Sequence, residues 1–199
     1  MSDKSPSTLL IACGALASEA SAILKQEGLD HVKLTCLPAK LHNTPQFIPD
    51  LLRAKIREHK DEFSEILVLY GDCGTAGGID TVLEEEGARR IEGAHCYEFY
   101  SGAKQFAEMF DEQPGTFYLT DFLVRHFERL VWQGLGLDRH PELLPMYFGN
   151  YTRVLYMGQM PTPELMDMAK EAAKRLELGF DYLDTGLVGL EKFLSVTHK

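Results

Sequence analysis

The chain alternates short apolar segments, partly β-branched, with longer segments in which apolar residues recur at helical spacing. This alternation is typical of α/β proteins, whose parallel strands are joined by helices that cover both faces of a sheet. We therefore expect an α/β fold with one open, mostly parallel sheet of about five to six strands. The expected strands span residues 8–12, 32–37, 66–70, 116–119, 154–157 and 180–183, with a shorter one at 89–91. The expected helices span residues 16–26, 47–60, 79–86, 104–110, 122–132, 163–176 and 187–195.

Length and charge limit the class of protein. The 199 residues fit a single α/β domain, expected over 8–199 after a flexible N-terminus at 1–7. A net charge of -10 argues against nucleic acids and anionic membranes as partners, because both are negatively charged. The N-terminus lacks a signal-peptide pattern and no apolar run has bilayer length, which predicts a cytoplasmic protein. There, the four cysteines are expected to be free thiols or metal ligands.

Cys73 lies in a glycine-rich loop that follows the expected strand at 66–70. The carboxyl ends of parallel strands form the edge where α/β sheets bind ligands, and a following helix start favours negative charge. This position suits a thiol to metal binding or nucleophilic attack. The loop lacks both the dinucleotide fingerprint and the Walker pattern, yet its backbone is expected to bind a carboxylate or phosphate. The backbone groups concerned belong to Gly71, Gly74, Thr75, Gly77 and Gly78.

Further reactive side chains follow the other strands at the same expected edge. Thiolates with imidazoles form a soft to borderline ligand set that selects Zn²⁺ over Mg²⁺. Their spacing is dispersed, without a C-x-x-C pair or an H-E-x-x-H helix. The predicted metal ligands are Cys13, Cys73, His95, Cys96 and His42. Asp72, Glu98 and Asp121 are expected as general base or as partners of the ligands, and Gln159 and Asp184 as further polar groups of the edge.

Structural interpretations stand beside these functional ones. Cys13 also fits close helix-to-sheet packing, and His42 also fits a turn that opens a helix. If the segment around His95 is extended, His95 and Cys96 face opposite sides and only one of them reaches the site. Cys36 is expected to be buried in the core. His31, His59 and His198 are expected to be solvated.

Three motifs together resemble one family. Ile11-Ala12-Cys13-Gly14, Leu69-Tyr70-Gly71-Asp72-Cys73-Gly74 and Ala94-His95-Cys96-Tyr97 are similar to the DUF1638 family of small bacterial and archaeal cytoplasmic proteins. The resemblance covers most of the chain. It implies that the protein is associated with corrinoid-dependent methyl-transfer systems. The D-x-H-x-x-G type of cobalamin-binding motif is missing.

The leading functional hypothesis is a zinc-dependent enzyme that acts on a small polar molecule, by methyl transfer or by hydrolysis. One alternative is a non-catalytic accessory protein that carries a metal or a corrinoid to a methyltransferase partner. A second is a metal-free enzyme in which Cys73 is the nucleophile and His95 or His42 its base. Aromatic residues in 117–132 also indicate a homodimer.

Overall fold

The computed structural model describes residues 7–195, which fall into two compact units. The first unit contains the chain up to Ala103 and the segment from Val188 onward, and the second contains Lys104–Leu187. The predicted flexible N-terminus falls largely on residues 1–6, and the predicted solvated His198 also lies outside the described residues.

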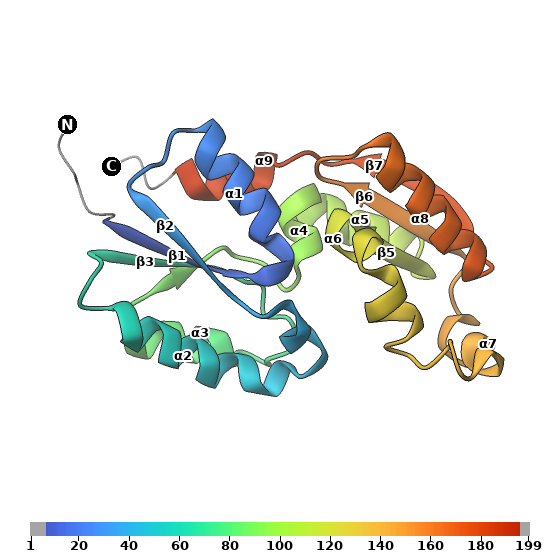
Figure 1. Cartoon of the computed structure of the whole chain (residues 1–199), viewed down its shortest axis with the longest axis horizontal. Helices are drawn as coiled ribbons and strands as arrows, with labels where there is room; N and C mark the ends of the chain where they lie inside the picture. The colour runs from blue at the N-terminus through green and yellow to red at the C-terminus, as the bar shows by residue number, and fades with distance from the viewer. Residues whose placement is uncertain (1–6, 196–199) are drawn as a thin grey trace. The chain divides into compact units, whose positions relative to one another are not determined.

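The first unit is built on a parallel sheet of four strands in the order β2-β1-β3-β4 (Figure 1). These strands are β1 Thr8–Cys13, β2 Val32–Leu37, β3 Glu65–Leu69 and β4 Arg89–Arg90. The helices are α1 Ala17–Gln26, α2 Ile48–His59, α3 Gly78–Glu86, α4 Cys96–Ser101 and α9 Val188–Leu194, with single 3-10 turns at Gly14–Leu16, Ala39–Asn43 and Pro45–Phe47.

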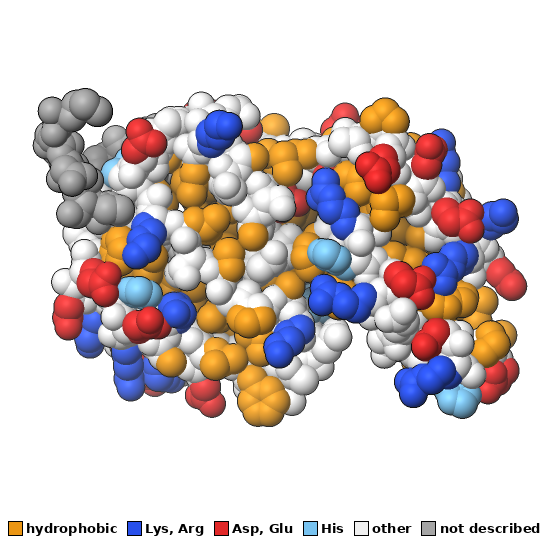
Figure 2. Space-filling view, in the orientation of Figure 1, with side chains coloured by type: hydrophobic (Ala, Val, Ile, Leu, Met, Phe, Trp, Pro, Cys, Tyr) orange, Lys and Arg blue, Asp and Glu red, His pale blue; other side chains and the backbone are white. Residues whose placement is uncertain are grey.

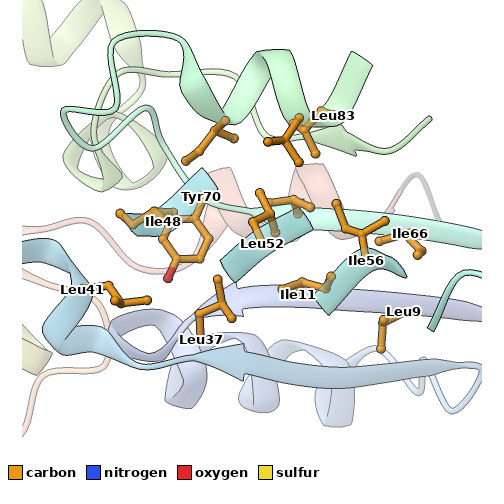
Figure 3. Close-up of a cluster of buried hydrophobic side chains, with 13 residues drawn as sticks. Leu9, Ile11, Leu37, Leu41, Ile48, Leu52, Ile56, Ile66, Tyr70 and Leu83 are labelled. Carbon is orange, nitrogen blue, oxygen red and sulfur yellow. The ribbon is translucent and has the colours of Figure 1, made fainter. Parts of the chain in front are cut away.

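The two central strands are buried on both faces, as expected of a parallel sheet covered by helices. Leu9 and Ile11 of β1 pack with Leu52 and Ile56 of α2, and the same cluster includes Leu83 of α3 (Figure 3). The intervening strand residues point to the opposite face because side chains alternate along a strand. Helices α1 and α9 lie on that opposite face (Figure 1).

The strand order changes direction between β1 and β3. The chain passes from β1 to its neighbour β2 and then returns to β3 on the other side of β1. The helices that follow β1 and β3 therefore leave toward opposite faces of the sheet (Figure 1). The loops that follow β1 and β3 therefore diverge at the carboxyl ends of these strands and leave a crevice between them. Open α/β sheets bind their ligands at such a switch point.

The second unit has its own parallel sheet of three strands in the order β5-β6-β7. The strands are β5 Thr116–Thr120, β6 Arg153–Gly158 and β7 Gly179–Asp184. The helices are α5 Ala103–Glu112, α6 Asp121–Arg125, α7 Leu144–Phe148 and α8 Pro163–Arg175, with a π-helical turn at Glu128–Trp132 and a 3-10 turn at Pro141–Leu143. Thr162 caps α8 by accepting from the Leu165 N–H at 3.2 Å, as the Thr-Pro-Glu pattern predicts.

The predicted α/β class and the parallel strand pairing are confirmed. The strands form two sheets where one of five to six strands was expected, because local hydrophobic patterns identify strands without stating which strands pair. The predicted helix over 122–132 is interrupted after Arg125 and resumes as the π-helical turn. Helix α4 was not predicted, and it rules out the fully extended conformation considered for His95 and Cys96.

The aromatic residues of 117–132 contribute to the second unit's own interior. Phe117 makes edge-on contacts with Phe148 and Tyr151, and Trp132 lies under the Arg175 guanidinium at 4.1 Å from ring centroid to Cζ. The homodimer therefore stays a prediction. Among residues 7–195, no helix is both long and apolar enough to cross a membrane. Acidic and basic side chains are mixed over the face of the molecule in Figure 2.

Candidate functional site

The loops that follow β3 and β4 are joined directly at the carboxyl edge of the first sheet. The Asp72 N–H donates to the Gly93 carbonyl at 3.2 Å, and the Cys73 N–H donates to the Ala94 carbonyl at 3.0 Å. A Cβ atom on Gly71 would lie 3.0 Å from the Ala94 oxygen, so glycine permits this close approach. Cys73 and the segment that begins α4 are thus held side by side.

The loops after β1 and β2 approach one another in the same way. A Cβ atom on Gly14 would lie 3.0 Å from both the Leu37 oxygen and the Ala39 nitrogen. Cys13, the last residue of β1, therefore lies at the edge where the first three strands end. Cys13 and Cys73 flank the switch point between β1 and β3.

Three thiols act on one another at this edge. Burial and, to a smaller extent, negative charge on Cys13 raise the pKa of Cys73 to about 11, although Arg90 opposes the shift. Burial also raises the pKa of Cys96 well above its usual range, and charge on Cys73 and Cys13 adds to that shift. These mutual effects connect Cys13, Cys73 and Cys96, three of the five residues predicted as metal ligands, and their role as ligands stays a prediction. We call these three residues the thiol cluster.

The raised pKa of Cys73 predicts an alkaline loss of stability in the metal-free protein. A native pKa of about 11 exceeds the unfolded value of about 8.5 to 9, so unfolding releases a proton at intermediate pH. The stabilisation is complete below the unfolded pKa and is lost as pH rises through the native pKa. We expect wild type to lose about 1.5 kcal/mol more unfolding free energy than Cys73→Ser between about pH 8 and about pH 10. Urea denaturation at both pH values measures this difference, and an equal pH dependence would contradict it.

Asp72 organises the glycine-rich loop. Its carboxylate accepts from the Thr75 hydroxyl at 2.8 Å, the Gly77 N–H at 2.8 Å and the Ala76 N–H at 3.2 Å. Burial opposes the charged form of Asp72, but these hydrogen bonds outweigh burial and lower its pKa. Of the backbone groups that were expected to bind an external anion, the Asp72 carboxylate occupies the Gly77 N–H, while the Thr75 and Gly78 N–H groups donate to the backbone carbonyls of Asp72 and Thr75. Anion binding by Gly71 and Gly74 stays a prediction. The structural role of Asp72 is to hold the turn that precedes α3, and its role as a base stays a prediction.

His95 and Glu98 form the start of α4. His95 is the extended residue before the helix, and its Nδ1 atom lies 3.2 Å from the Glu98 carboxylate. Glu98 also accepts from the Ala94 N–H at 3.2 Å, an arrangement similar to a capping box. His95 is exposed, whereas Cys96, the first residue of α4, belongs to the thiol cluster. Glu98 as a base or ligand partner stays a prediction.

His42 lies in the 3-10 turn after β2. Although the residue is exposed overall, partial burial of its ring lowers the pKa of His42, and positive charge on His95 lowers it further. Both imidazoles are therefore close enough to interact, and His42 is biased toward the neutral form that binds metals or accepts protons. The structure brings both predicted histidines to the same edge as the thiols.

Cys36 differs from its predicted place in the core. It lies on β2 beside Ala12 of β1 and is partly exposed. Burial raises the pKa of Cys36, and charge on Cys13 raises it further. Cys36 therefore lies next to the thiol cluster, but within β2 and not at the carboxyl edge of the sheet.

Three further residues lie at this edge and were not predicted as part of the site. Tyr70 follows β3 and is 2% exposed, and Glu19 in the first turn of α1 is 1% exposed. Negative charge on Glu19 contributes to the raised pKa of Cys96. Arg90 donates to the Ile91 and Gly93 carbonyls at 2.8 and 3.0 Å and so fixes the loop that leads to His95. Of these three residues, only Arg90 has a signal in the sequence, since two consecutive arginines, Arg89 and Arg90, precede the apolar Ile91.

The remaining predicted edge residues belong to the second sheet. Asp121 follows β5, Gln159 follows β6, and Asp184 ends β7. Asp121 is fully buried, and its carboxylate accepts from the Tyr156 hydroxyl at 2.7 Å and from the Gln159 and Met160 N–H groups. The single edge predicted from the sequence is thus divided between two sheets.

Within residues 7–195, no group of three or more His, Cys, Asp and Glu side chains is already arranged to hold a metal ion. The thiols are protonated and lie near one another without the geometry of a coordination shell. Binding of a cation by the thiol cluster therefore requires deprotonation and side-chain rotation.

The fold and the site define an α/β protein with a cluster of thiols at the switch point of a parallel sheet. The chain belongs to the family described as protein of unknown function (DUF1638), whose model matches residues 36–194. The resemblance noted from its motifs is thus confirmed. No curated protein and no solved structure matches the chain.

Proposed function

We propose that this protein is a metal-dependent enzyme that binds a soft cation, zinc in the first instance, through the thiol cluster. The observation that carries the proposal is the convergence of three cysteines on the switch point: Cys13 from the end of β1, Cys73 from the loop after β3 and Cys96 from the start of α4. Sulfur ligands select Zn²⁺ over hard cations such as Mg²⁺. His42 and His95 would supply nitrogen ligands or accept protons at the same edge.

The electrostatics favour a cation over the metal-free alternative. A thiol with a pKa of about 11 is almost entirely protonated at neutral pH, and the thiol is a poor nucleophile. The positive charge of Arg90 lowers the pKa of Cys73 by less than burial and the neighbouring negative charges raise it. A bound metal ion would supply the missing positive charge and hold the sulfurs as thiolates.

Catalysis depends on an open coordination position. Zinc with three protein ligands activates a water molecule or a substrate thiol, whereas a site closed by four ligands only stabilises the fold. Three sulfur ligands would leave a fourth coordination position of zinc for water or a small polar substrate, with hydrolysis and methyl transfer to or from a thiol as the two reactions to test. The neutral His42 imidazole would take the proton that the reacting group releases.

The accessory-protein alternative differs in what the metal or corrinoid does. A carrier would present its metal or corrinoid to a methyltransferase partner without turning over a small molecule. The reduced thiols and the acidic charge fit a cytoplasmic protein that does not bind nucleic acids.

Absorption spectra of the cobalt-substituted protein distinguish an enzyme from a carrier. A small thiol added to a site with an open coordination position changes the thiolate-to-cobalt absorption bands, whereas a thiol added to a closed site does not.

Zinc titration of the reduced protein against a chromogenic chelator tests the proposal. We expect wild type to bind a single zinc ion per chain and Cys73→Ser to bind it at least about 100-fold more weakly, since even indirect partners of metal ligands are worth about 10- to 100-fold. Cys36→Ser is the matched control, because Cys36 neighbours the cluster but lies outside it. Absence of binding in wild type, or equal affinity in wild type and Cys73→Ser, would refute the proposal.

A further inference from the structure

Two neighbouring arginines of the second unit, Arg125 and Arg129, have no acidic partner in the described part of the chain. Within residues 7–195, neither guanidinium lies at ion-pair distance from an Asp or Glu side chain, whereas every other arginine does. Both residues are exposed. Because the chain has a net charge of -10, acidic partners are abundant, and two adjacent cations without one require an explanation.

The acidic side chains nearest to these arginines in the sequence are engaged elsewhere. Asp121 is fully buried and accepts from the Tyr156 hydroxyl at 2.7 Å. Glu128 accepts from the Arg175 guanidinium at 2.7 Å. The positive charge of the two arginines is therefore available to an anion from outside the chain.

His126 lies between the two arginines, where α6 ends and the π-helical turn follows. Its imidazole is in edge-on contact with the Phe122 ring, at 4.6 Å between centroids, which fixes the position of the imidazole. The Leu130 N–H donates to the His126 carbonyl at 2.8 Å, so one helical turn follows the break. Side chains three positions apart on such a turn are neighbours, which places Arg129 beside the imidazole. π-Helical turns within helices are frequent at functional sites.

The imidazole of His126 adds a neutral donor to the two cations. Burial lowers the pKa of His126, and the positive charges of Arg129 and Arg125 lower it further. The imidazole is therefore mostly neutral at neutral pH and carries one N–H donor. The three side chains together offer two permanent positive charges and one neutral N–H group.

A phosphate group fits this combination better than a carboxylate. Two guanidinium groups match the charge of a phosphate dianion, and each presents a fork of N–H donors. A carboxylate has two oxygens, which one guanidinium satisfies, whereas a phosphomonoester has three terminal oxygens for two guanidiniums and an imidazole. The acidic charge of the chain disfavours polyanions such as nucleic acids, so a small phosphate compound is the better match.

We propose that Arg125, His126 and Arg129 bind the phosphate group of a small phosphomonoester. We call these three residues the phosphate site. The site lies entirely in the second unit and includes no residue of the thiol cluster. It therefore goes beyond the proposed metal-dependent function, and each of the two proposals can fail without the other.

Equilibrium dialysis of the reduced protein, without added metal, tests the phosphate site with labelled inorganic phosphate and glycerol 3-phosphate as probes. We expect wild type to bind a single phosphate group per chain. Arg125→Gln and Arg129→Gln are each expected to bind it about tenfold more weakly, because each variant loses a charge-assisted hydrogen bond. Absence of saturable binding in wild type, or equal affinity in wild type and both variants, would overturn the proposal.

Glutamine is a good helix former and both arginines are exposed, so the variants are expected to unfold at the same urea concentration as wild type. Arg139→Gln is the matched control, because Arg139 belongs to the same unit, lies outside the phosphate site and has a side chain that is 74% exposed. It removes the same charge, so an equal loss of affinity would show a general effect of charge and contradict the site.

Competition experiments check the class of ligand. Acetate at matched ionic strength is expected to leave the phosphate bound, because it lacks the third oxygen. Displacement by acetate at a concentration equal to that of phosphate would rule out a site for a phosphate group. Tighter binding of a duplex oligonucleotide than of glycerol 3-phosphate would refute the small phosphomonoester as the ligand.

Discussion

Replacement of Asp121 by alanine is expected to lower the free energy of unfolding by about 3 to 5 kcal/mol, because it leaves several buried donors without an acceptor. The carboxylate accepts from the Tyr156 hydroxyl at 2.7 Å, the Met160 N–H at 2.8 Å and the Gln159 N–H at 3.2 Å. The Gln159 side chain in turn accepts from the Asp121 N–H at 2.9 Å. This network joins the ends of β5 and β6, and alanine would remove three of its hydrogen bonds at once.

The single tryptophan, Trp132, lies in the second unit and packs against its core cluster. Its fluorescence during urea denaturation therefore reports the unfolding of the unit that contains Asp121. Asp121→Asn is the matched control, because it keeps the shape and one acceptor oxygen, and we expect it to cost about 1 to 2 kcal/mol. If Asp121→Ala unfolds at the same urea concentration as wild type, the network does not stabilise the unit.

The expected behaviour of Asp121 shows what the sequence could and could not predict. Its place directly after a strand was correctly predicted, because an apolar run that ends in a polar residue marks the carboxyl end of a strand. The sequence did not reveal that Asp121 is fully buried among donors from β6, since hydrogen bonds between residues about forty positions apart depend on which strands pair. For the same reason, the strands were placed in one sheet, and the structure has two.

The thiol cluster was partly visible in the sequence. Cys13 ends the apolar strand β1, and Cys73 lies in the loop after the apolar strand β3. The carboxyl ends of parallel strands lie at one edge of the sheet, which brings such residues together. Tyr70 lies in the expected strand at 66–70 and Glu19 in the expected helix at 16–26, but the sequence did not predict their burial at the edge, because that burial is set by tertiary packing. The predicted start of the helix at Pro163, with Thr162 as its N-cap, is confirmed, because an N-cap depends only on neighbouring residues.

Helix α4 was missed for a related reason. Its residues Tyr97, Phe99 and Tyr100 favour strands by intrinsic propensity, and the helix has only six residues. Short helices are not stable alone and depend on packing against other elements. In this protein α4 packs against α9, which lies about ninety residues further along the chain. Contacts of that kind leave no local signal at Cys96.

The packing of α9 on α4 predicts that Gly189→Ala strongly lowers the stability of the first unit. A Cβ atom on Gly189 would lie 2.9 Å from the carbonyl carbon of Phe99 and closer still to the carbonyl oxygen. The obstacle is backbone of α4, which cannot rotate away as a side chain can. We therefore expect Gly189→Ala to destabilise the first unit by about 3 kcal/mol, at the upper end of the usual cost of overpacking.

Displacement of α9 should also reach the thiol cluster, because Cys96 is the first residue of the helix that α9 covers. Hydrogen exchange should become faster over Cys96–Ser101, and alkylation of Cys96 should become faster as its thiol loses cover. Val188→Ala is the matched control on the same helix, because Val188 is 69% exposed and its truncation removes little buried surface. If Gly189→Ala and Val188→Ala give the same midpoint and the same Cys96 reactivity as wild type, α9 does not hold α4 in place and Cys96 is positioned by its own loop.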